Sequence, residues 1–404
     1  MFKRWLEDLI KSDLSRKKSV LLIGSRRVGK TTLVRMVGGE NSVYHTFDDV
    51  DLQSAIKQSP KYIEKICSKS KLNILDEVQK APGLFDTLKL LIDKGYLFIL
   101  TGSSALHLLE DVSETLAGRI RIRHLPTCAW GEPENETPEE KGKSIIVNRS
   151  MEAVDPLLFQ QAKSDFPFFI QYGGFPELVG KDYQEKDDIL KDYRNTYLQR
   201  DILELTNIQD LVAFRGLLAA LAQSIGTPVN YQHLARESGL SHVTAKKYLH
   251  ALAQTFIIFR VLPYHYGPSK RFLKSPKWYF LDVGMLNSLN LRISEGQLFE
   301  NFVIAEVYKR LIINNMDYDQ IFFYKSAKGA EIDLLVEQKD YLSLYEIKSS
   351  RSISSKFTRN IRKFEVPLKK EDSQLNKYVI YTGEEYGEDE GVLYVPIYSW
   401  YGLL

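Results

Sequence analysis

One short segment of the chain carries residue types that bind phosphate. Residues 24–31 read GSRRVGKT, in which a lysine–threonine pair follows the second glycine. Glycines allow a tight turn whose N–H groups point at phosphate oxygens. The lysine can reach the β- and γ-phosphates, and the threonine hydroxyl can bind Mg²⁺. We expect the loop to bind a nucleoside triphosphate such as ATP through Gly24, Ser25, Arg26, Arg27, Val28, Gly29, Lys30, Thr31 and Thr32.

Two acidic residues end a second run that has the composition of a strand. Residues 71–77 read KLNILDE. A carboxylate at the exit of a buried strand is costly unless a positive group meets it, and Mg²⁺ on the nucleotide would be that group. We expect Asp76 to hold the metal through water and Glu77 to orient and deprotonate the attacking water. An acidic loop without a metal is the alternative.

Hydroxyl groups follow a third apolar run, residues 96–100. The next four residues are Thr101, Gly102, Ser103 and Ser104. Ser103 could sense the γ-phosphate or position the attacking water. Equally, these hydroxyls could cap a turn into the next helix.

The elements that must position these residues alternate along the first third of the chain. The apolar run 19–23 precedes the phosphate loop, and residues 32–37 can open a helix after it. This pattern over residues 1–130 predicts an α/β domain with a parallel sheet. Residues 131–215 would be a linker and helical region, residues 216–290 a winged helix-turn-helix, and residues 291–404 a smaller α/β domain.

Bulk composition narrows the function classes. Lys and Arg total 54 against 52 Asp and Glu in 404 residues, so the net charge of +2 gives no global argument for nucleic acid. The two cysteines lack metal-binding spacing and fit a reducing compartment. The N-terminus lacks the apolar core of a signal peptide, and no apolar run could span a bilayer. We therefore expect a cytoplasmic protein without a membrane partner.

Residues 229–240 and 242–252 have a helix-turn-helix pattern, with Gly239 at the turn and Ser241 as N-cap. Val243, Leu249 and Leu252 would face the core, and His242, Thr244, Lys246 and Lys247 would remain outside. A basic wing would follow at residues 270–280. Exposed cations on a second helix suit DNA phosphates, although such modules also mediate protein contacts.

The C-terminal region holds a second set of acidic residues. Residues 330–336 and 342–348 would pair as a hairpin, bringing Asp333, Glu346 and Lys348 together. The helix at 297–303 would add Glu300. Three carboxylates that hold Mg²⁺, with a lysine that orients water, suit phosphodiester hydrolysis. Alternatively, Lys348 and Glu346 form an ion pair in place of the metal. The basic run 348–363 could follow a nucleic-acid backbone or be a solvated helix face.

Nearly the whole chain resembles the large archaeal and bacterial family of AAA-type P-loop ATPases with a C-terminal domain of uncharacterised function. The resemblance rests on the order of GSRRVGKTTL, LNILDEVQ, LFILTGSS, LAGRI, YGGFPE, YLQRDI, LFENFV, EIDLLV and YEIKSS, with the helix-turn-helix between them. The C-terminal part is similar to restriction-endonuclease-like nucleases, and Glu300, Asp333, Glu346 and Lys348 fill their acid, acid and acid-x-lysine pattern. Residues 125–132 match only loosely the proline and acidic segment that usually follow LAGR.

Arginines complete the set of candidate site residues. Arg119 is a candidate arginine finger, acting in cis or on a neighbouring subunit of a homo-oligomer, or else it forms a salt bridge. Arg194 and Arg200 could approach the nucleotide or pair with nearby acids. The resemblance implies a Mg²⁺-dependent ATPase coupled to a DNA-binding, nuclease-like module. The alternative is a nucleotide-dependent switch or scaffold whose nuclease-like domain is inactive.

Overall fold

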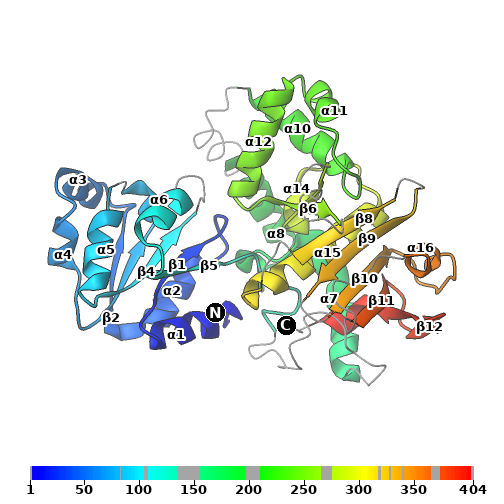
Figure 1. Ribbon diagram of the computed structural model, residues 1–404, viewed down its shortest axis with the longest axis horizontal. Coiled ribbons are helices and arrows are strands. Elements are labelled where there is room, and N and C mark those ends of the chain that lie inside the picture. The colour runs from blue at the N-terminus through cyan, green and yellow to red at the C-terminus, as the bar shows by residue number, and fades with distance from the viewer. Residues whose placement is uncertain are drawn as a thin grey trace.

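A computed structural model describes most of the chain (Figure 1). It covers residues 2–81, 83–103, 108–134, 155–196, 210–264, 275–316, 320–326, 329–338, 341–364 and 374–401. Within these residues the fold is α/β, with a five-stranded parallel sheet at the N-terminal end, a helical middle and an eight-stranded mixed sheet at the C-terminal end.

The N-terminal sheet brings the candidate nucleotide residues to one edge. Its strands are β1 (Ser19–Ile23), β2 (Ser42–Thr46), β3 (Leu72–Asp76), β4 (Leu97–Gly102) and β5 (Ile120–His124). They lie in the order β2-β3-β4-β1-β5, and every pairing is parallel. Because parallel strands end at a common edge, the loop after β1, the acids at the end of β3 and the hydroxyls at the end of β4 are neighbours.

Helices cover both faces of this sheet. Their bounds are α1 (Leu6–Ser15), α2 (Lys30–Gly38), α3 (Val50–Gln58), α4 (Tyr62–Ile66), α5 (Phe85–Asp93) and α6 (Leu108–Thr115), with short 3₁₀ turns η1 (Gly39–Asn41) and η2 (Val78–Lys80). Helices α1 and α2 share one apolar core with the sheet, and α3 to α6 share another on the opposite face. Alternate side chains of each strand fill the two cores.

The middle region is helical, as expected. It contains α7 (Pro156–Tyr172), η3 (Pro176–Leu178), α8 (Tyr183–Asp192), α10 (Leu211–Gln223), α11 (Tyr231–Glu237), α12 (His242–Gln254) and α14 (Val283–Ser288). Gly239 adopts a φ of +68° between α11 and α12, and the Ser241 side chain accepts a hydrogen bond from the Thr244 N–H. The helix-turn-helix prediction is therefore confirmed as local structure.

One predicted core position in this motif is wrong. Val243 is 75% exposed, whereas Leu249 and Leu252 are buried. Val243 lies three and four residues before Lys246 and Lys247, which are also exposed. Residues at that spacing share a helix face, so the valine belongs to the outer surface of α12.

The C-terminal sheet includes two strands from residues 216–290, the region that the sequence predicts to be a separate winged helix-turn-helix. Its strands are β6 (Ile258–Pro263), β7 (Lys277–Phe280), β8 (Ile321–Lys325), β9 (Glu331–Glu337), β10 (Tyr341–Lys348), β11 (Gln374–Tyr381), β12 (Gly387–Asp389) and β13 (Val392–Pro396). The order is β12-β13-β11-β10-β9-β8-β6-β7. Because β6 pairs with β8, the strands β6 and β7 extend this sheet. Residues 270–274 of the expected wing lie outside the described residues.

The predicted hairpin is confirmed by the antiparallel pairing of β9 with β10. The remaining elements are α15 (Glu295–Ile313), α16 (Arg359–Arg362) and η6 (Ile397–Trp400). Most of α15 is buried, and its core extends from Trp130 to Tyr401, so the helical middle and the C-terminal sheet share one interior. No helix in the described part of the chain is both long and apolar enough to cross a membrane.

Candidate nucleotide site and C-terminal acidic cluster

The loop between β1 and α2 has the shape that its glycines require. A Cβ on Gly24 would lie 2.3 Å from the Leu125 carbonyl oxygen, so a side chain does not fit there. Gly29 has a φ of +88° and immediately precedes α2, a conformation that glycine adopts without strain. Ser25 and Val28 are buried, whereas Arg26, Arg27 and Thr32 are exposed.

Lys30 is folded back onto its own loop. Its Nζ donates to the carbonyl oxygens of Gly24 at 2.9 Å and Ser25 at 2.8 Å. Burial lowers the pKa of Lys30 to about 8, although the carboxylates of Glu77 and Asp76 act to raise it. The loop thus encloses one ammonium group that a phosphate could draw outward.

Asp76 accepts hydrogen bonds from three hydroxyl groups, one on helix α2 and one on each of the strands β2 and β4. Its Oδ2 accepts from Thr31 Oγ1 and from the Tyr44 hydroxyl, each at 2.7 Å, and its Oδ1 accepts from the Thr101 hydroxyl. A threonine hydroxyl beside a carboxylate is a donor set that suits Mg²⁺. Sequence reasoning missed Tyr44, because a tyrosine in the edge strand β2 has no motif.

Glu77 lies in the left-handed region with a φ of +58°. Its backbone N–H donates to Thr101 Oγ1 at 3.1 Å, and its Oε2 accepts from Ser103 Oγ at 3.1 Å and from the Gln79 side chain. Ser103 therefore belongs to the polar surroundings of Glu77. Ser104 lies outside the described residues.

Arg119 is remote from the phosphate loop. It precedes β5, whose Ile120 pairs with Ser19 at the start of β1, whereas the phosphate loop follows the end of β1. Its guanidinium is paired with Asp93 at 2.7 Å. A finger acting in cis is therefore wrong, because the strand length separates the two edges. Of the other arginines, Arg194 donates to the Ser288 carbonyl at 2.6 Å, and Arg200 lies outside the described residues.

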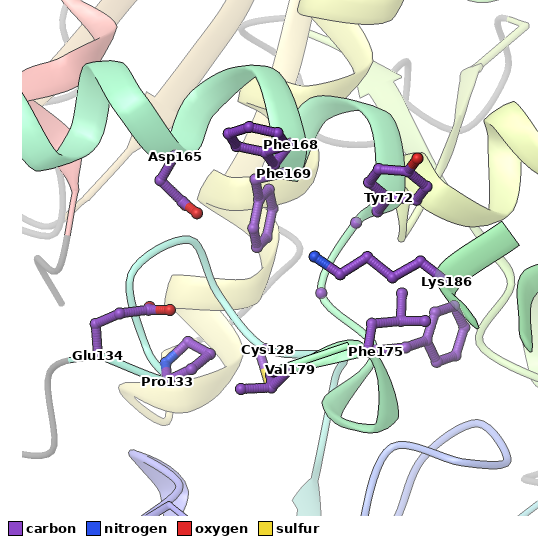
Figure 2. Close-up of a pocket in the computed structure, with 14 residues that line it drawn as sticks. Cys128, Pro133, Glu134, Asp165, Phe168, Phe169, Tyr172, Phe175, Val179 and Lys186 are labelled. Atoms are coloured by element: carbon purple, nitrogen blue, oxygen red, sulfur yellow. The ribbon is translucent and has the colours of Figure 1, made fainter. Parts of the chain in front are cut away.

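The YGGFPE segment contacts the phosphate loop with its C-terminal end and lines a cavity with its N-terminal end. Arg27 lies 3.5 Å from Glu177, and a Cβ on Gly29 would be 3.8 Å from Pro176. Figure 2 shows the cavity of about 110 Å³, into which Lys186, Asp165 and Glu134 project polar groups. Burial raises the pKa of both Asp165 and Glu134.

The C-terminal hairpin brings together the residues that the sequence predicted to cluster. Lys348 Nζ lies 2.8 Å from Glu346 Oε1 and 3.2 Å from Asp333 Oδ2. Asp333 Oδ2 also accepts from the Ile347 N–H at 2.8 Å. The two acids and the lysine that the predicted hairpin is expected to bring together are therefore neighbours.

A second lysine, Lys277 of β7, fills the rest of this cluster. Its side chain is fully buried, and its Nζ lies 2.7 Å from Glu331 and 3.6 Å from Glu300. Tyr279, two residues on, donates its hydroxyl to Glu300 at 2.7 Å. Sequence reasoning missed both side chains because it placed β7 in a separate wing.

The electrostatics of the acidic cluster follow from burial and crowding. Burial and, to a smaller extent, the neighbouring Asp333 raise the pKa of Glu346 to about 8, although Lys348 opposes the shift. Burial and Asp333 also raise the pKa of Glu300. The Glu346 Oε2 is buried without a hydrogen-bond partner in the described structure. Among the residues whose placement is described, no three His, Cys, Asp or Glu side chains form a metal-binding group.

Three protein families match successive parts of the chain. Residues 16–133 match the family described as "AAA domain". Residues 163–296 match "Domain of unknown function (DUF8612)", and residues 295–400 match "Domain of unknown function (DUF4143)". Residues 16–133 are therefore similar to an AAA domain, and the two regions that follow are similar to two domains of unknown function.

Its relatives come from bacteria and archaea. An uncharacterized protein of Mycobacterium tuberculosis is 28% identical over 386 residues, covering 92% of this chain and 78% of the relative. An uncharacterized protein of Methanocaldococcus jannaschii is 24% identical, covering 95% and 88%. Among solved structures, a mutant of RuvB from Thermotoga maritima matches with a TM-score of 0.30 and 17% identity, covering 63% of this chain and 86% of that one.

Proposed function

We propose that the N-terminal domain binds and hydrolyses ATP with Mg²⁺. The observation that carries the proposal is the hydrogen bond from Thr31 to Asp76 beside the buried Lys30. In the ATP-bound protein, Lys30 would exchange its carbonyl partners for phosphate oxygens, and Thr31 and Asp76 would hold Mg²⁺, which neutralises charge on the phosphates. Glu77 would orient the attacking water and accept its proton.

Two substitutions test this proposal. Lys30→Ala removes the ammonium group and should abolish ATP binding in calorimetry, whereas Glu77→Gln should retain binding but lose turnover, trapping ATP. Lys57→Ala changes an exposed lysine on α3 and is the matched control. Equal turnover by wild type and Glu77→Gln would contradict the role of Glu77, and wild type that binds no nucleotide would end the proposal.

Arg119 remains a candidate finger for a neighbouring subunit. It lies at the edge of the sheet opposite to the loop and is about one-third exposed. A second copy could use this edge in a homo-oligomer, so Arg119→Ala should lower kcat without changing ATP affinity. Light scattering of the nucleotide-bound protein would show whether an oligomer exists.

For the C-terminal region, we infer a module that binds without cutting. The two buried or half-buried lysines, Lys277 and Lys348, already supply positive charge to the four acids around them. The exposed Lys246 and Lys247 on α12 support DNA as the partner. DNA binding by this module would then depend on the nucleotide state of the N-terminal site.

Phosphodiester hydrolysis is a second candidate for the same module. The observation that favours it is the unpartnered Glu346 Oε2, which adjoins Asp333 and Lys348. Mg²⁺ held by Glu300, Asp333 and Glu346 would compete with Lys277 for Glu300 and with Lys348 for the other two carboxylates. Incubation of plasmid and branched DNA with Mg²⁺ or Mn²⁺ discriminates the candidates: cleavage lost in both Asp333→Ala and Lys348→Ala favours a nuclease, and no cleavage by wild type favours the binding module.

A further inference from the structure

Arg4, which precedes α1, is attached to the phosphate loop. Its Nη1 donates to the Val28 carbonyl oxygen at 2.7 Å, and its Nη2 donates to the Pro126 carbonyl oxygen at 2.9 Å. Its Nε donates to Glu132 Oε1 at 2.8 Å. The side chain of Arg4 is only 6% exposed. One planar guanidinium therefore joins three chain segments that are distant in sequence.

Glu132 is equally enclosed. Its side chain is completely buried, and besides Arg4 it accepts from the backbone N–H groups of Trp5 at 2.8 Å and Ala129 at 2.9 Å. A buried ion pair costs desolvation that Coulomb attraction often only offsets. Its value to the molecule therefore lies in the geometry that it imposes on the backbone groups around it.

The backbone of the phosphate loop shows which geometry matters. If its N–H groups are to point at phosphate, its carbonyl groups must point away and find donors elsewhere. Lys30 Nζ donates to the carbonyl oxygens of Gly24 and Ser25, and the Leu33 N–H donates to the carbonyl oxygen of Gly29. The carbonyl oxygen of Val28, which also lies in the loop, accepts a hydrogen bond from Arg4.

We propose that Arg4 and Glu132 are a positioning pair, which holds the Val28 peptide so that the loop is shaped for phosphate before the nucleotide arrives. The pair rests on the proposed ATP-binding function and touches no nucleotide atom. It acts through Val28, and it makes nucleotide affinity depend on the docking of segment 125–132.

That segment is held on its other side by α15 of the C-terminal region. Lys309 Nζ donates to the Cys128 carbonyl oxygen at 3.1 Å, and the Trp130 N–H donates to Glu306 Oε2 at 2.8 Å. Both side chains are almost fully buried. The positioning pair therefore lies at the point where the C-terminal region can influence the phosphate loop.

The test compares Arg4→Met, Arg4→Lys and Glu132→Gln in the full chain, with Arg16→Met as control. Arg16 is an exposed arginine that follows α1. Methionine keeps most of the side-chain volume but no donor, and lysine keeps the charge but cannot reach three acceptors in a plane. Calorimetry would give the Kd for ADP and ATP with Mg²⁺, steady-state kinetics would give KM and kcat, and a thermal melt would report folding.

We expect Arg4→Met to raise both Kd values and KM about tenfold or more, with kcat within about threefold of wild type because Glu77 and Asp76 are untouched. Arg4→Lys and Glu132→Gln should lie between Arg4→Met and wild type. A purely structural role would lower the melting temperature and the active fraction, and with it kcat, while KM stays constant. If Arg4→Met does not fold, the other two variants carry the comparison.

Unchanged Kd and KM in folded Arg4→Lys and Glu132→Gln would overturn the proposal. This result is distinct from failure of the proposed function, which would show as wild type that binds no nucleotide. Loss of affinity in Arg16→Met equal to that in Arg4→Met would also overturn it, because the effect would then follow from the charge of the N-terminal region.

Discussion

The ammonium group of Lys277 lies 2.7 Å from Glu331, and the lysine side chain has no exposed surface. The second oxygen of the same carboxylate, Oε2, lies 2.9 Å from Lys325 Nζ, and the Lys325 side chain is 46% exposed. One glutamate thus has a buried and an exposed partner. This pair of lysines separates the effect of a buried charge from that of a surface charge within one experiment.

Lys277→Met should destabilise the protein by about 3–5 kcal/mol, because it leaves Glu300 and Glu331 partly buried without their shared cation. Lys325→Met should cost about 0–1 kcal/mol, since an exposed partner is screened by water. Chemical denaturation monitored by fluorescence measures both. Equal losses in the two variants would show that Lys277 does not compensate the cluster.

Metal addition extends this comparison. If Lys277 occupies the space of a cation, millimolar Mn²⁺ should raise the melting temperature of Lys277→Met by several degrees and leave wild type unchanged, because ligand binding to the folded state stabilises it. A shift of similar size in wild type would instead favour the metal-dependent nuclease. The melts can be recorded without any assay of activity.

Tyr44→Phe removes the hydroxyl that donates to Asp76 and keeps the ring that packs 4.0 Å from the Arg35 guanidinium. A hydrogen bond to a charged acceptor contributes about 1.5–3 kcal/mol. We expect the apparent Mg²⁺ requirement of ATP hydrolysis to rise about tenfold, since Asp76 loses orientation. Tyr62→Phe on α4 is the control. An identical Mg²⁺ titration for both variants would exclude a role for Tyr44.

The pKa of Lys30, lowered to about 8 by burial, predicts how ATP affinity depends on pH. Bound phosphate favours the charged lysine and raises its pKa, so above pH 8 binding must take up a proton. Affinity should therefore be level from about pH 7 to 8 and then fall about tenfold per pH unit. Calorimetry in buffers of different ionisation enthalpy measures both the affinity and the proton uptake. Constant affinity up to pH 10 would contradict the assignment.

The double substitution Lys246→Ala/Lys247→Ala should weaken the binding of duplex DNA. It should also reduce the slope of log binding constant against log salt concentration by about two phosphate contacts, because each cation that meets a phosphate releases counterions. Lys57→Ala/Lys61→Ala changes two exposed lysines of the N-terminal domain and should leave DNA binding unchanged. Fluorescence anisotropy over a range of salt concentrations gives both slopes. Equal salt slopes for the two double variants would contradict a contact between α12 and DNA and would favour a protein partner for this helix.

Local patterns predicted the elements better than they predicted the contacts between them. The run 19–23, the loop after it and the acids of 71–77 identified the candidate nucleotide site, because strand, turn and helix each leave a local pattern. The cluster of Asp333, Glu346 and Lys348 followed from hairpin register. Lys277, Arg4 and Tyr44 could not be predicted in the same way, since each meets its partner across tertiary packing and carries no motif.

The buried segment 125–132 bears on how the molecule can be divided. The match to the AAA domain ends at residue 133, yet Trp130 just before that end is fully buried among aromatic rings that include Phe302 and Tyr401. A fragment that stops at residue 133 would expose this indole and remove Glu306 and Lys309 from the backbone around it. Expressed alone, such an N-terminal fragment should therefore be prone to aggregate, and a weakly binding fragment would be a poor guide to the nucleotide affinity of the intact chain.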